Sequence, residues 1–200
     1  MSVSGPASDE PAITRARWLT PCVVLAAAVA FGAADQYIGS RYWLFATAVS
    51  GMSAPWLLLP FIAGVCSSGP RRAAWLGFAA TWLAIVAYVL MIDSPVEGVH
   101  TSFRIIAVSA ASQWPWFLGG IVSGPGYGFL GYWWRRRRSW LSAALAATPL
   151  LFEPVIAVLG LRYTASVVAS CAEALAGLVL AASFAVAIAR FRRQPAARPS

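Results

Sequence analysis

Residues 71–93, RRAAWLGFAATWLAIVAYVLMID, decide the fold class of this chain. An arginine pair opens the stretch, an aspartate closes it, and the run 73–92 between them carries no charge. A helix needs about 20 apolar residues to cross the hydrocarbon core of a bilayer, and it pairs its own backbone groups there. The stretch therefore predicts a transmembrane helix over 73–92.

The composition extends this prediction to the whole chain. Its 200 residues are 60% hydrophobic and 11% charged, whereas soluble domains carry about 25% charged residues. Five further apolar runs lie at about 18–34, 43–66, 104–133, 140–160 and 165–189. We expect an all-α bundle of about six transmembrane helices over 18–190. A disordered cytoplasmic tail, 1–17, precedes it, and a basic cytoplasmic tail, 191–200, follows it.

The arginines predict the orientation of this bundle. Cytoplasmic connectors of membrane proteins are enriched in basic residues. Most of the fifteen basic residues fall in alternate connectors and tails: Arg15, Arg17, Arg71, Arg72, Arg135, Arg136, Arg137, Arg138, Arg190, Arg192, Arg193 and Arg198. Only Arg41, Arg104 and Arg162 fall in the others. We therefore expect both termini in the cytoplasm of a bacterial cell, with the protein in the plasma membrane. The run Arg135–Arg138 holds its connector inside, and anionic lipid headgroups are a further ligand for it.

The first span leaves one alternative open. Arg15 and Arg17, a short apolar run and the sequence Gly32-Ala33-Ala34 also resemble a secretory signal peptide. Cleavage there would leave five spans and place the new N-terminus outside the cell.

Small residues at intervals of four predict where helices touch. Helices in lipid associate through close backbone approach at such positions. Gly120, Gly124 and Gly128 form one stripe. Ala169, Gly177 and Ala181 lie on a second stripe in the last span. We expect these faces to pack within the bundle, although the same faces suit a membrane partner or a second copy of the chain.

Polar residues gather in the half of the bundle predicted to face outside. Glu153 and Glu173 lie within spans, about 10 and 12 Å from the outer helix ends at a rise of 1.5 Å per residue. Gln113 lies about 14 Å into the fourth span on the same arithmetic. Asp35 closes the first span and Arg104 opens the fourth. Ionisable groups inside a membrane line a cavity, pair with another group or take up a proton. These residues therefore predict a polar pocket or a structural pair.

Two functions remain open at this stage. The first is binding or transport of a small solute through this outer pocket, lined by Glu153, Glu173, Gln113, Asp35 and Arg104. Proline breaks in the second, fourth and fifth spans favour it, because interrupted helices line binding sites in transporters. The alternative is a scaffold or partner subunit that docks other membrane proteins through its small-residue faces.

Catalytic motifs are missing. His100 is the one histidine, so an HExxH zinc site is excluded, and no P-loop or dinucleotide glycine pattern occurs. We therefore expect no enzyme activity, no metal and no cofactor. The net charge of +8 does not indicate nucleic acid, because the arginines lie in short clusters between apolar spans.

Several short motifs carry a resemblance. They are the acidic Asp35, Ser53-Ala54-Pro55-Trp56, Arg71-Arg72-Ala73-Ala74 and Ala87-Tyr88. With the glycine-rich fourth span and its arginine run, the chain resembles an uncharacterised family of small actinobacterial integral membrane proteins, a domain of unknown function. This resemblance implies no activity and no site. A looser similarity, through Ala26, Ala30 and Ala34, is to substrate-binding subunits of energy-coupling-factor transporters, in which such residues dock a transport partner.

Overall fold

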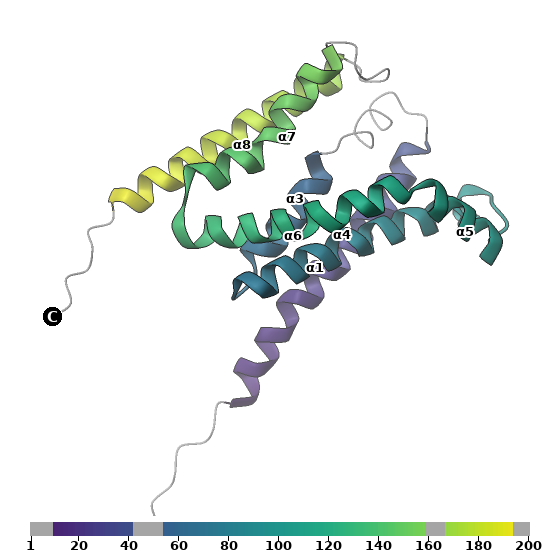
Figure 1. The fold of residues 1–200 in the computed structure, drawn as a ribbon, viewed down its shortest axis with the longest axis horizontal. Helices are drawn as coiled ribbons and strands as arrows, with labels where there is room; N and C mark the ends of the chain where they lie inside the picture. The colour runs from purple at the N-terminus through teal and green to yellow at the C-terminus, as the bar shows by residue number, and fades with distance from the viewer. Residues whose placement is uncertain (1–9, 42–53, 159–166, 194–200) are drawn as a thin grey trace, which may run out of the picture.

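The computed structural model describes residues 10–41, 54–158 and 167–193, and it confirms the all-α class for them. These ranges hold seven α-helices, one 3-10 helix and no strand (Figure 1). The helices are α1 (Glu10–Gly39), α3 (Ala54–Val65), α4 (Pro70–Ile92), η1 (Pro95–Glu97), α5 (Phe103–Ser112), α6 (Trp114–Arg137), α7 (Trp140–Val158) and α8 (Val167–Arg193).

Three segments in the described ranges are long and apolar enough to cross a membrane: Leu19–Gly39, Pro70–Ile92 and Ala174–Arg192. The bent pair α5 and α6 makes a fourth if it counts as one span, and Ala54–Val65 and Trp140–Phe152 are shorter apolar helices. Large apolar side chains point outward, with Val122 76% and Leu178 60% exposed. Such exposure in water would be costly, so the surface is consistent with a membrane protein.

The predicted span 104–133 is not one continuous helix. Helix α5 ends at Ser112, α6 begins at Trp114, and their axes differ by 62°. Pro115 explains the break, because proline lacks the N–H that an uninterrupted helix requires and disfavours helical geometry in the residue before it. Gln113 therefore lies at a bend, not 14 Å inside a straight helix.

Helix α1 also differs from its prediction. It begins at Glu10, within the predicted tail 1–17, and continues to Gly39, about one turn beyond Asp35. Pro11 fits the first turn, where a backbone N–H would have no helical partner. Of the predicted span 43–66, the described part is α3 from Ala54 onward. The end of the fifth predicted span and the start of the sixth lie outside the described residues.

Glycines bring the central helices into backbone contact. A methyl group on Gly128 of α6 would overlap the carbonyl oxygen of Ala73 in α4, and one on Gly64 of α3 would overlap the carbonyl oxygen of Gly128. Gly32 of α1 meets Ala84 of α4 in the same way. We call the contacts made by Gly32, Gly64 and Gly128 the glycine seam. The helices approach so closely there that no side chain fits between them.

Two side-chain clusters flank the seam. One joins α1, α3 and α4 and consists of Val24, Ala28, Ala63, Ala80 and Ala84. The other joins α3, α6, α7 and α8, with Phe61, Trp134, Ala143, Ala146, Phe184 and Ile188. In this second cluster, the ring centroid of Phe184 lies 4.4 Å from that of Trp134 and 5.9 Å from that of Phe61. In Figure 1, α7 and α8 lie side by side along one flank of the bundle, so this aromatic contact ties α8 to the central helices.

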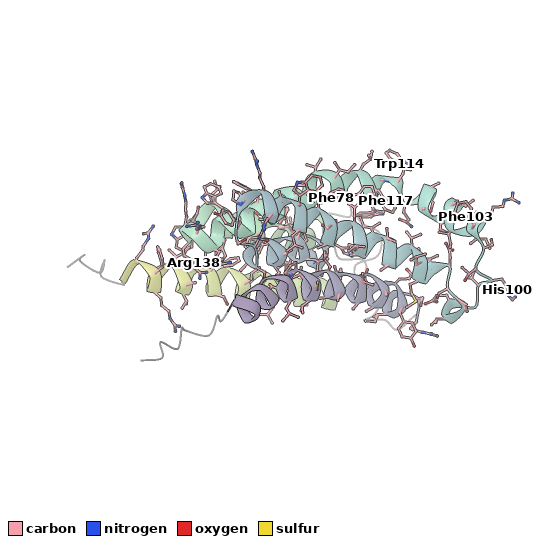
Figure 2. The ribbon with its side chains drawn as sticks, turned by 90° about the horizontal axis from the view of Figure 1, so that it is seen from below. Phe78, His100, Phe103, Trp114, Phe117 and Arg138 are labelled. Atoms are coloured by element: carbon pink, nitrogen blue, oxygen red, sulfur yellow. The ribbon has the colours of Figure 1, made fainter. Side chains whose placement is uncertain are left out.

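The bundle has two chemically different ends. Figure 2 shows Arg138 toward one end and His100 and Phe103 toward the other, with the start of α1 and the end of α8 on the Arg138 side. At the arginine-rich end, the Nη1 atom of Arg135 donates hydrogen bonds to the carbonyl oxygens of Val65 (3.2 Å) and Ser67 (3.1 Å). These bonds satisfy carbonyls at the end of α3 that have no helical partner.

Candidate functional site

The site is centred on the carboxylate of Asp35, near the His100 end. Asp35 is half-buried, and its Oδ2 atom accepts a hydrogen bond from the indole Nε1–H of Trp56 in α3, 3.3 Å away. Because α1 continues to Gly39, the carboxylate lies inside the helix and does not cap its end. Arg41, the next basic residue along the chain, lies over the ring of Tyr37 at 4.4 Å.

Three aromatic rings pack together beside this position. The ring of Trp56 contacts Phe31 of α1 at 5.2 Å between centroids and Tyr88 of α4 at 5.8 Å. The interplanar angles are 73° and 75°, so both contacts are edge-to-face. All three rings are half-buried. Helices α1, α3 and α4 thus each supply one ring, and α1 supplies the carboxylate as well.

This arrangement can attract a cation. Aromatic faces carry negative potential, and a carboxylate beside them adds a full charge in surroundings of reduced dielectric. No ion pair to Asp35 is found among the described residues, where its side-chain partner is Trp56. We name Asp35, Phe31, Trp56 and Tyr88 the Asp35 cluster.

A second carboxylate, Asp93, lies at the same end and is tied into the fold. Its Oδ1 atom accepts from the Ser109 hydroxyl of α5 at 2.9 Å, and its carbonyl oxygen accepts from the Thr101 hydroxyl at 2.7 Å. Asp93 is 3% exposed, and its Oδ2 atom has no hydrogen-bond partner. These bonds hold α5 against the end of α4, so we assign Asp93 a structural role.

Two of the other predicted pocket residues, Gln113 and Arg104, are described, and neither is hydrogen-bonded to Asp35. Gln113 is half-buried at the bend between α5 and α6, and Arg104 is exposed on the first turn of α5. No hydrogen bond joins either residue to Asp35 within the described ranges. Glu153 lies on α7 and Glu173 on α8, but their side chains lie outside the described residues. Their part in a pocket stays a prediction.

The predicted packing glycines lie against neighbouring helices. Gly120 faces Thr81 and Ile85 of α4, and Gly124 faces Gly77 and Phe78 of the same helix. Gly177 of α8 faces two leucines of α7, with Leu151 2.9 Å from an added methyl group. Ala181 is half-buried, whereas the side chain of Ala169 lies outside the described residues. Two helix pairs are therefore joined through small residues within one chain.

Sequence reasoning did not identify Phe31, Trp56 and Tyr88 as site residues. Trp56 and Tyr88 stand in motifs that carry the family resemblance, yet nothing in the sequence places either ring beside Asp35. A tryptophan directly after Pro55 within an apolar run was the available signal, because a buried indole N–H seeks an acceptor.

Fold and site together define an all-α protein with several helices able to cross a membrane and a half-buried carboxylate among aromatic rings. No protein-family model, no curated protein and no solved structure matches the chain. The resemblance to the actinobacterial family therefore stays a prediction. Among the described residues, no group of three or more metal-ligating side chains occurs.

Proposed function

We propose that this chain is a six-span protein of the bacterial plasma membrane that binds, and carries across the membrane, a small cationic solute. The observation that carries the proposal is the Asp35 carboxylate, half-buried among Phe31, Trp56 and Tyr88. Desolvating a carboxylate is costly unless a partner compensates for it. A bound cation would provide that partner, and the aromatic rings would favour an organic ammonium group.

The predicted pocket residues complete this proposal. Glu153 and Glu173 would add negative charge from α7 and α8, which suits a cation. Gln113 would line the path at the bend of the fourth span, and Arg104 would stand at its outer mouth. Glu173→Gln is then expected to weaken solute binding with expression intact.

Thermal stabilisation of the purified protein tests the cation site. Millimolar tetramethylammonium or choline should raise the Tm in detergent by about 5 °C, as expected for a ligand well above its Kd. Asp35→Asn should abolish this rise, because the amide keeps the shape and removes the charge. Glu97→Gln is the matched control, since it removes a carboxylate at the same end, where Glu97 accepts from Ser40, and it should keep the rise.

Two results would contradict the proposal. An equal rise in the Asp35→Asn protein would show that the cation binds elsewhere. No rise with any ammonium ion in the unaltered protein would favour the scaffold role over the transport role.

The orientation is a separate prediction. Arg138 and His100 lie toward opposite ends of the bundle (Figure 2), and the positive-inside rule puts the arginine-rich end in the cytoplasm. In a chain whose cysteines, Cys22, Cys66 and Cys171, are replaced by alanine, His100→Cys should react with a membrane-impermeant maleimide on intact cells. Arg137→Cys should react only after the cells are permeabilised, and the reverse pattern would refute the orientation.

A further inference from the structure

A groove of about 710 Å³ lies at the arginine-rich end, between α8 and the residue that ends α6. Two arginines line it, Arg138 and Arg190. Its wall along α8 is formed by Val179, Val186 and Phe191, with the Ser183 hydroxyl between them. One end of the groove is thus cationic, and the remainder is apolar.

None of the residues that line the groove is an Asp or a Glu. The segments 98–152 and 174–200 contain no Asp or Glu. Arg138 instead lies over the ring of Trp134, with 5.0 Å from its guanidinium carbon to the ring centroid. Two guanidinium groups in a groove whose lining holds no carboxylate attract an anion.

The backbone of Arg138 gives an independent indication. Its φ of 47° is left-handed, and it is the one non-glycine residue with positive φ in the described ranges. Arg138 caps α6 by donating its backbone N–H to the carbonyl oxygen of Trp134. Glycine is the usual residue at such a cap, because the Cβ atom of any other residue crowds the backbone there. An arginine at a position that favours glycine suggests that its side chain is used.

We propose that this groove binds one anionic phospholipid. Its phosphate lies between Arg138 and Arg190, and one acyl chain follows the apolar wall of α8. The site suits a lipid because an exposed tryptophan at this end, Trp140, is typical of the headgroup level of a bilayer. The volume is within the range of about 300–1,000 Å³ seen for small-molecule sites. The inference rests on the proposed membrane embedding, but it is independent of the Asp35 cluster.

Native mass spectrometry of the full chain in detergent tests the inference. The unaltered protein should retain one phosphatidylglycerol at least tenfold more tightly than phosphatidylcholine with the same chains. The double variant Arg138→Gln, Arg190→Gln should lose this preference. The double variant Arg136→Gln, Arg137→Gln removes the same charge from neighbouring positions outside the groove and should keep it.

Arg138→Gly separates lipid binding from folding. Glycine relieves the left-handed backbone, so the Tm in detergent without added lipid should stay or rise, while the preference for phosphatidylglycerol falls about tenfold. An unchanged preference in this variant would overturn the proposal.

Further outcomes would also overturn it. If both double variants weaken binding equally, the attraction comes from overall charge and not from the groove. If soluble glycerol phosphate binds as tightly as the lipid, the apolar wall contributes nothing. A dimer that is lost only in the Arg138, Arg190 variant would assign the groove to a second copy. Because no ammonium ion is used, these outcomes leave the test of Asp35 unaffected.

Discussion

Replacing Gly128 by alanine is expected to disrupt the bundle, while the same change two residues away is tolerated. The added methyl group would overlap the carbonyl oxygen of Ala73, and the backbone of Gly77 also lies close to it. Backbone atoms cannot rotate away as a flexible side chain can, so α4 and α6 would have to separate. We expect a loss of about 3 kcal/mol or more in the free energy of unfolding, at the upper end for overpacking.

Gly126→Ala is the matched control for this prediction. It lies on the same helix, and an added methyl group would meet nothing within 4 Å. Alanine is a better helix former than glycine by about 1 kcal/mol, so Gly126→Ala should keep or raise stability. The free energy of unfolding of both variants is measured in mild detergent by titration with sodium dodecyl sulfate. Equal stability of the two variants would show that the glycine seam is not as close as described.

Phe184→Ala is expected to detach α8 from the central helices. The Phe184 side chain is 7% exposed and contacts the rings of Trp134 in α6 and Phe61 in α3. Removing a buried phenyl ring leaves a cavity and costs about 3–5 kcal/mol. The same unfolding measurement applies, and cross-links between α8 and α6 should become inefficient.

Leu178→Ala provides the comparison on the same helix. Leu178 is 60% exposed, so its truncation removes few protein contacts and should change stability by less than about 0.5 kcal/mol. A loss as large as that of Phe184→Ala would mean that α8 is held through its exposed face and not through the aromatic cluster.

Much of the fold could be predicted because its signals are local. The charge-free run 73–92 corresponds closely to α4, and the glycines at 120, 124 and 128 lie against α4 in the structure. A proline break in the fourth span was predicted, but its place at Gln113 was not, because hydropathy continues across the bend and Pro115 alone does not distinguish a kink from a break. The extension of α1 beyond Asp35 was missed because an acidic residue commonly marks a helix end.

The candidate site was harder to predict than the fold. Asp35 was identified because a carboxylate beside an apolar run is conspicuous. Its partners Trp56 and Tyr88 lie on other helices, and which ring meets it depends on helix rotation and register. The glycine seam sets this rotation and register. It depends on contacts between helices, so the sequence of one apolar segment does not reveal it.

The glycine seam also restricts where this molecule can change shape. Helices joined backbone to backbone have no rotamers to exchange, so α4 and α6 must move as one rigid frame. Any rocking that exposes a solute first to one side of the bilayer and then to the other would have to come from the α7–α8 hairpin. The frame would then stay still while α7 and α8 move, and the contacts of Phe184 with Trp134 and Phe61 would have to change.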